Sequence, residues 1–132
     1  MKHKINITVR YAETDRMGVA YYANYLVWFE VARTEFLKSL GVSYREIEEK
    51  EGLGLMVVES RCKYRSPVTY DDTITVETWV SEVKRSSLAF DYKITLKDTL
   101  VAEGRTYHVF VNKKRNPVKI PQGFLEIIQP TS

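Results

Sequence analysis

Residues 24–40 read NYLVWFEVARTEFLKSL, and their apolar side chains recur three or four positions apart, which predicts one long α-helix. Gly41 follows directly, at the position where a helix C-terminus favours glycine. Apolar residues also occupy most of the remaining circumference, at Leu26, Val27, Val31 and Leu37. A helix of this kind is usually surrounded by other elements. The segment therefore predicts a central helix around which the rest of the chain folds.

The remainder of the chain alternates between apolar and polar residues over long stretches, as β-strands do. Residues 5–11 alternate before the helix, and four longer stretches follow it, at residues 55–65, 73–84, 87–97 and 100–112. Ser43 and Glu46 fit a capping box for a short second helix, and another short helix is expected around residues 123–128. One sheet with one buried helix is an α+β architecture, and such long strands predict strong curvature. The sheet edges and its second face need cover, which favours dimerisation.

Composition narrows the class of protein further. The chain has 132 residues and a net charge of +3 with both signs interspersed, so we expect one domain, residues 1–132, without a nucleic-acid surface. Cys62 is the single cysteine and His3 and His108 are the only histidines, which argues against a disulfide or a zinc site. No segment is apolar enough for a signal peptide or a membrane span, which predicts a cytoplasmic protein. Any chemistry is then expected from carboxylates, hydroxyls and main-chain dipoles.

Residues 11–25 read YAETDRMGVAYYANY and place two carboxylates, Glu13 and Asp15, and a glycine, Gly18, just before the long helix. A helix N-terminus carries unpaired N–H groups and a partial positive charge. It can therefore bind a carboxylate, a phosphate or the developing oxyanion of an acyl transfer. The alternative is that Asp15 only opposes the helix dipole and Gly18 only makes a turn. Spacing alone favours that alternative, since acidic residues are common before helices.

The same segment resembles a family signature. The pattern TDxxGVxYxxNY over residues 14–25, followed by FExARTE over residues 29–35, resembles that of the 4-hydroxybenzoyl-CoA thioesterase family. The small bacterial acyl-CoA thioesterases of the Tol–Pal-associated type are the most similar, and YRxP at residues 64–67 extends the resemblance over nearly the whole chain. The resemblance implies the hotdog fold, a curved antiparallel sheet of about five strands wrapped around one central helix. It also implies homodimers with a continuous sheet, in some cases homotetramers, and hydrolysis of acyl-CoA without a metal or prosthetic cofactor.

The resemblance also implies roles for residues of this loop. Asp15 is the catalytic acid residue, acting as a nucleophile on the thioester carbonyl or as a general base on water, and the sequence leaves both routes open. A main-chain N–H near Tyr22 is the expected oxyanion donor, and Gly18 keeps the loop close to the thioester. Many relatives have histidine where this chain has Tyr22, so no imidazole acts there. His108 is no substitute, because it lies in the middle of a strand among apolar neighbours.

Coenzyme A carries phosphates, so a basic site is expected at the mouth of the active site. The candidates lie at a strand connection where relatives contact the cofactor portion of the substrate: Lys84, Arg85, Ser86 and Ser87. A solvated turn is the alternative. Glu30 and Tyr25 are implied to lie near the acyl group, although Glu30 is equally suited to an ion pair with Arg33 within the helix. The aromatic side chains between positions 21 and 29 are expected partly to line an acyl tunnel and partly to fill the core.

The sequence suggests roles for several other residues less strongly. We expect Glu13 to be a solvated surface charge, or else to point to the same side as Asp15 and have a pKa raised by repulsion. The basic row at residues 61, 63 and 65 can touch phosphates or pair with acidic neighbours. Trp79 is a candidate for a dimer surface or a pocket wall, and Cys62 for a small buried side chain.

Two other functions remain open from sequence alone. An acyl-carrier-protein thioesterase is the nearest enzymatic alternative, because a basic patch also suits an acidic carrier helix. A non-catalytic acyl-CoA-binding or scaffold protein is the second, although a pure binder has no use for a carboxylate such as Asp15 beside a thioester. The acyl group itself, aromatic or aliphatic, is not determined.

Overall fold

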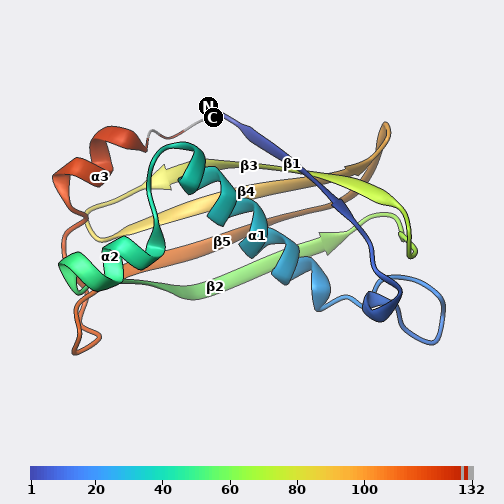
Figure 1. Ribbon diagram of the computed structural model, residues 1–132, viewed down its shortest axis with the longest axis horizontal. Coiled ribbons are helices and arrows are strands. Elements are labelled where there is room, and N and C mark those ends of the chain that lie inside the picture. The colour runs from blue at the N-terminus through green and yellow to red at the C-terminus, as the bar shows by residue number, and fades with distance from the viewer. Residues whose placement is uncertain (129, 131–132) are drawn as a thin grey trace.

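A single antiparallel sheet organises the computed structural model, which describes residues 1–128 and 130 (Figure 1). Its five strands lie in the order β1-β3-β4-β5-β2, so β1 and β2 are the edges. Their bounds are His3–Thr8 for β1, Gly54–Tyr64 for β2, Thr73–Val83 for β3, Ser87–Leu96 for β4 and Thr99–Val111 for β5. All neighbouring strands pair antiparallel. The five alternating stretches of the sequence are thus the five strands of the sheet.

One long helix, α1 (Asn24–Ser39), lies across one face of this sheet (Figure 1). Its buried stripe packs on the inward side chains of the strands and forms one hydrophobic core, whose largest fully buried members include Trp28, Phe29, Tyr92, Phe90 and Phe110. Two short helices, α2 (Tyr44–Glu51) and α3 (Gln122–Ile127), lie at the end of the sheet where α1 finishes (Figure 1). No helix among the described residues has the length and apolar character needed to cross a membrane.

The close fit of helix on sheet depends on Gly104. This residue of β5 faces α1, and a Cβ there would lie 2.5 Å from the Phe29 ring and 2.5 Å from the carbonyl oxygen of Arg61. The absence of a side chain allows the Phe29 ring to stack on Tyr92 of the neighbouring strand, with ring centroids 4.2 Å apart. Gly104 therefore sets how deeply α1 lies in the curve of the sheet.

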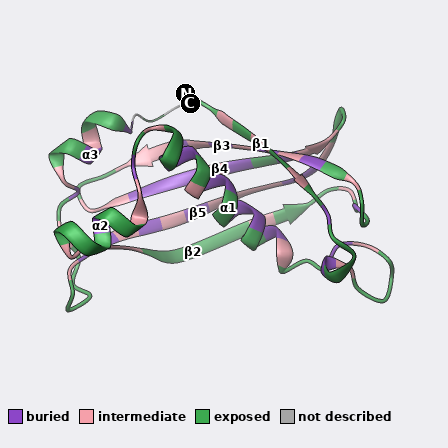
Figure 2. Cartoon of the chain, in the orientation of Figure 1, coloured by how far each residue is buried: buried purple, intermediate pink, exposed green. Residues whose placement is uncertain are grey.

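Three expectations about these elements need correction. The first strand ends at Thr8, and Tyr11 lies instead in a short 3₁₀ turn (Tyr11–Glu13) with its side chain exposed. Ser43 is the N-cap of α2, but its side chain makes no capping hydrogen bond. In the single chain α1 is covered by the sheet on one side only, and its opposite face exposes apolar side chains: Leu26, Val27 and Val31 (Figure 2). The prediction of a fully surrounded helix is wrong for the isolated chain.

Candidate active site

The loop before α1 is a narrow turn that presents Asp15. The main-chain N–H of Asp15 donates to the carbonyl of Val19 at 2.9 Å, and that of Gly18 donates back to the carbonyl of Asp15 at 3.0 Å. Gly18 has φ +81°, a left-handed conformation that glycine adopts without steric cost. The carboxylate Oδ1 of Asp15 accepts the N–H of Met17 at 2.8 Å, while the residue remains exposed. The turn thus holds the Asp15 carboxylate at the surface in a defined direction.

The connection between β2 and β3 fastens this loop to the sheet. Ala20 donates its N–H to the carbonyl of Val68 at 2.8 Å, and the Thr69 hydroxyl donates to the carbonyl of Gly18 at 2.7 Å. Because β2 ends beside the loop, residues distant in sequence meet there (Figure 1).

A surface cavity of about 370 Å³ opens where loop, helix and strand meet. The loop and the first turn of α1 contribute Asp15, Val19, Ala20, Tyr21, Tyr22 and Tyr25, and the end of β2 with the following residues contributes Tyr64, Arg65, Ser66 and Pro67. The predicted site residues Asp15, Tyr22 and Tyr25 are therefore brought together. Tyr64 was not singled out as a site residue, and Arg65 was considered only as a possible phosphate contact, although the YRxP pattern that contains both was part of the family resemblance.

Four tyrosines give the cavity an aromatic wall. The Tyr64 ring meets the Tyr25 ring edge-on, with centroids 4.9 Å apart and an interplanar angle of 89°, and its hydroxyl donates to the carbonyl of Tyr22 at 3.2 Å. Desolvation beside Cys62 and Tyr25 raises the pKa of Tyr64 to about 12. Its hydroxyl therefore stays protonated at neutral pH and remains a hydrogen-bond donor. Trp28 and Phe29, by contrast, lie in the core.

A main-chain donor just before α1 belongs to Tyr22, a residue that lines the same cavity. Asn24 donates its N–H to the carbonyl of Tyr21 at 3.0 Å, and Tyr25 donates to the carbonyl of Tyr22 at 3.3 Å. The main-chain N–H of Tyr22 makes no hydrogen bond to any part of the chain that the structure describes. A helix N-terminus concentrates positive partial charge, so this N–H is suited to a developing oxyanion.

Glu13 differs from both expectations for it. Its side chain is buried, with the residue 7% exposed, and does not face Asp15 as a repelling charge. Oε1 accepts the main-chain N–H of Arg10 at 2.8 Å, and Oε2 accepts the indole N–H of Trp28 at 3.0 Å. Burial alone would raise the pKa of Glu13, but these hydrogen bonds and the Arg10 guanidinium together hold it below its usual value. Glu13 is thus a buried carboxylate that stays charged, which the sequence did not predict.

The predicted coenzyme A contacts lie far from Asp15 within one chain. Residues 84–87 form the turn between β3 and β4, at the opposite end of β3 from the Asp15 loop (Figure 1). β3 has 11 residues, so at about 3.3 Å per residue its two ends are about 35 Å apart. Lys84 is paired with Glu82 at 3.5 Å. Within a single chain the structure does not bring the turn and Asp15 together.

Glu30 is exposed on α1 and does not line the Asp15 cavity. Its expected partner Arg33 is buried and donates instead to the Tyr92 hydroxyl at 3.4 Å, so the ion pair within the helix is absent among the described residues. His108 lies in the core, with its Nε2 2.7 Å from the Thr106 hydroxyl. Burial raises the pKa of the Cys62 thiol to about 11, so it is protonated at neutral pH and is not a nucleophile.

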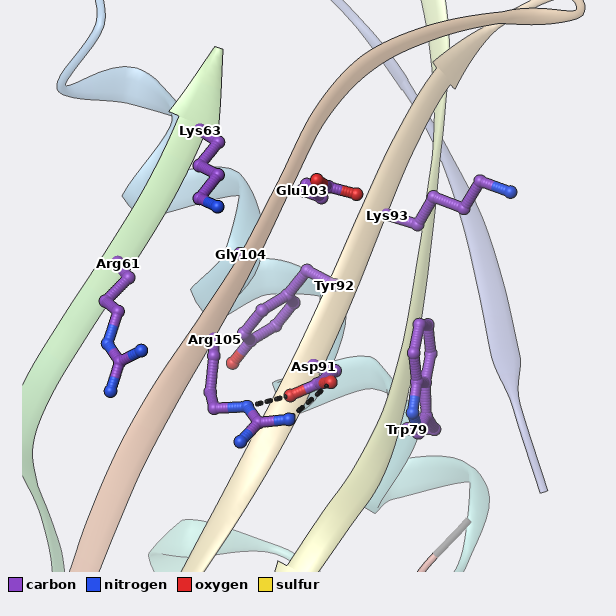
Figure 3. Close-up of a pocket in the computed structure, with 9 residues that line it drawn as sticks. All are labelled: Arg61, Lys63, Trp79, Asp91, Tyr92, Lys93, Glu103, Gly104 and Arg105. Carbon is purple, nitrogen blue, oxygen red and sulfur yellow. Dashed lines mark hydrogen bonds and ion pairs between the residues drawn. The ribbon is translucent and has the colours of Figure 1, made fainter. Parts of the chain in front are cut away.

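A second hollow, of about 340 Å³, lies on the face of the sheet turned away from α1 (Figure 3). Arg105 and Asp91 form a two-point ion pair there, at 2.6 and 3.0 Å, and Trp79 forms part of the wall. Arg61 and Lys63 of the basic row line this hollow. Two members of the row are paired, since Arg61 contacts Glu59 and Arg65 contacts Glu103. The hollow contains no part of the Asp15 loop.

No group of three or more His, Cys, Asp or Glu side chains among residues 1–128 and 130 is placed to hold a metal ion. A curved antiparallel sheet on one long helix, with a carboxylate-bearing loop at the helix N-terminus, defines the hotdog class of thioester hydrolases.

Comparisons with known proteins agree with that class. Residues 9–128 match the family described as the thioesterase-like superfamily, and the chain belongs to it. The acyl-CoA thioesterase YbgC of Haemophilus influenzae is 35% identical over 118 residues, which cover 88% of this chain and 86% of that protein. A DHNA-CoA thioesterase from Staphylococcus aureus superposes with a TM-score of 0.88 at 33% identity, covering 95% of this chain and 85% of the other. A protein from Aquifex aeolicus superposes with a TM-score of 0.91 at 32% identity, covering 96% and 99%. The predicted family, fold and thioesterase class are confirmed.

Proposed function

We propose that this chain hydrolyses the thioester of an acyl-coenzyme A to the free acid and CoA, with Asp15 as the catalytic carboxylate. The observation that supports it is one cavity lined by Asp15 and by Tyr22, whose main-chain N–H makes no hydrogen bond to the described residues. Two of the relatives named above are an acyl-CoA thioesterase and a DHNA-CoA thioesterase, which supports an acyl-CoA as the class of substrate here.

The reaction balances in either of two routes. As a general base, Asp15 accepts a proton from water while the water oxygen bonds to the thioester carbon, and the carbonyl oxygen becomes an oxyanion that accepts the Tyr22 N–H. The intermediate then expels the CoA thiolate, which takes up the proton. As a nucleophile, the Asp15 carboxylate bonds to the same carbon and expels the CoA thiolate. Water then hydrolyses the resulting mixed anhydride, which releases the acid, regenerates the Asp15 carboxylate and supplies the proton that the thiolate takes up.

The test is release of free thiol from a panel of acyl-CoAs, from short aliphatic to long-chain, benzoyl and hydroxybenzoyl groups. Wild type is compared with Asp15→Asn and with the control Asp98→Asn, an exposed carboxylate in the β4–β5 turn. We expect Asp15→Asn to lose about 100-fold or more in rate and the control to lose nothing. An inactive wild type, or an Asn variant as active as wild type, excludes the assignment, and the acyl-carrier-protein and binding alternatives would then be tested.

We propose further that the active unit is a homodimer formed through β2. This strand is a sheet edge and is exposed along most of its length, with Met56, Val57 and Val58 among its exposed apolar residues (Figure 2). The exposed apolar face of α1 adds to the surface that needs cover. An open edge strand of this kind is a template for pairing with another chain.

Such a dimer would also join the two halves of the predicted site. If β2 pairs antiparallel with β2 of a second copy, the Tyr64 end of one strand lies beside the Gly54 end of the other. Gly54 pairs with Val111, and the neighbouring Phe110 donates to the carbonyl of Ser86. The second copy's turn at residues 84–87 is then only two strand spacings, or about 10 Å, from this edge. Asp15 and the basic turn would meet across the interface.

Mixed dimers test this composite site. One variant carries Asp15→Asn and the other carries Lys84→Ala with Arg85→Ala, and the two are refolded together in equal amounts. If each site combines both chains, half of the dimers contain one intact site of two, so about a quarter of the wild-type activity returns. If both groups serve one site within a chain, mixing restores nothing. A cytoplasmic location and the absence of a cofactor stay predictions.

A further inference from the structure

Glu13 holds together the two parts of the proposed site. Its carboxylate accepts the N–H of Arg10 at 2.8 Å on one side and the indole N–H of Trp28 at 3.0 Å on the other. Its carbonyl accepts the N–H of Tyr21 at 2.8 Å and the side-chain amide of Asn24 at 2.8 Å. Trp28 and Asn24 belong to α1, whereas Arg10 and Tyr21 belong to the segments that enter and leave the loop.

These contacts matter because the loop has no other described hydrogen bond to the α1 side chains. Its other described hydrogen bonds are internal, run to the β2–β3 connection, or join the carbonyls of Tyr21 and Tyr22 to the α1 main chain and the Tyr64 hydroxyl. The one described hydrogen bond of the Asp15 carboxylate comes from the N–H of Met17. Asp15 follows Glu13 by two residues, and Tyr22 follows directly after the Tyr21 N–H that Glu13 holds. Among the described residues, Glu13 is therefore the one loop residue that is hydrogen-bonded to α1 side chains.

The presence of a carboxylate at Glu13 supports a role beyond stability. A buried carboxylate loses solvation, and an apolar group of similar volume would often stabilise a core as well or better. Unlike an apolar group, a carboxylate fixes the relative positions of two donors, because each of its two oxygens accepts one hydrogen bond. The lowered pKa of Glu13 keeps both oxygens available as acceptors.

We propose that Glu13 is a positioning residue for the thioesterase reaction: its carboxylate, by bonding both Arg10 and Trp28, fixes the Asp15 loop against the N-terminal part of α1. The inference rests on the proposed function of Asp15. Glu13 does not touch the substrate, so it acts on the geometry of the transition state and leaves binding of the acyl-CoA nearly unchanged.

The test uses Glu13→Gln and Trp28→Phe, with the exposed α2 residue Glu48→Gln as the matched control. Glutamine keeps the shape but presents a donor to Arg10 or Trp28, and phenylalanine removes the indole donor. We expect each variant to lower kcat about 10- to 100-fold with KM changed by less than about threefold, because small displacements of a reacting group cost that much. The double variant should be little worse than either single one, because both act through one contact.

An independent signal comes from the indole N–H resonances of the two tryptophans, Trp28 and Trp79. The Trp28 signal, identified by its loss in Trp28→Phe, should shift in Glu13→Gln and stay in place in Glu48→Gln. If wild type and the Glu13 variants share the same kcat while Asp15→Asn is inactive, the positioning role is wrong and the proposed function stands. If wild type hydrolyses no acyl-CoA, the proposed function itself fails. A rise in KM with kcat unchanged would also overturn the positioning role.

Discussion

Replacing His108 by glutamine should remove a large part of the acid sensitivity of this fold. The His108 side chain is 1% exposed in β5 and packs edge-on against Phe90, with ring centroids 5.3 Å apart. Its Nδ1 has no partner among the described residues. Burial, and secondly the nearby Arg33 guanidinium, lower the pKa of His108 from 6.5 to about 3. The folded protein therefore holds a neutral imidazole, whereas the unfolded chain takes up a proton near the ordinary value.

The size of the effect follows from this difference in pKa. Because the folded pKa is the lower one, stability is complete above the unfolded value and is lost as the pH falls. Each pH unit between about 6.5 and about 3 removes about 1.4 kcal/mol of unfolding free energy. From about pH 7.5 to about pH 5, the imidazole of His108 alone should remove about 2 kcal/mol.

Urea unfolding of wild type and His108→Gln at these two pH values measures the difference directly, at one fixed protein concentration. Carboxyl groups titrate alike in both proteins, so their contribution cancels. His3→Gln, which retains the buried imidazole of His108, should keep the wild-type loss. If wild type loses no more stability than His108→Gln between the two pH values, the argument from burial is refuted.

Three other outcomes are expected. Gly104→Ala should lower the free energy of unfolding by about 1–3 kcal/mol in urea, because the added Cβ would overlap Phe29. The control Gly123→Ala has open space around it and should cost far less. Equal effects of the two substitutions would contradict the close packing of α1. Val58→Lys, on the exposed edge of β2, should shift the mass measured by light scattering from dimer to monomer, and an unchanged mass would place the interface elsewhere. Cys62 should resist alkylation by iodoacetamide at about pH 8 in the folded protein and react readily in urea, because burial raises its pKa to about 11; rapid reaction of the folded chain would contradict this.

The elements with strong local periodicity could be predicted from sequence. The period of α1, with Gly41 after it, is a property of neighbouring residues, and Gly41 has φ +82° as the C-terminal position requires. The Asp15 loop could be predicted because its glycine and its position before the helix are also local. Tyr11 was misplaced because alternation alone does not show where a strand stops.

The remaining features depend on contacts between distant segments. The burial of Glu13 depends on Trp28, which lies fifteen residues further along the chain. The part of the cavity formed by Tyr64 and Arg65 depends on where β2 ends relative to the loop. The separation of residues 84–87 from Asp15 follows from the direction of β3 in the sheet. No pattern within a single segment carries this information.

The contact between Phe29 and Gly104 has a consequence for the path of a long acyl group. With the ring stacked on Tyr92 and no side chain on Gly104, α1 rests directly on the middle of the sheet. An acyl chain that enters beside Tyr25 is therefore blocked from the centre of the protein. If it turned outward along the exposed Leu26 and Val27 instead, the length it could reach would be set by whatever covers that outer face.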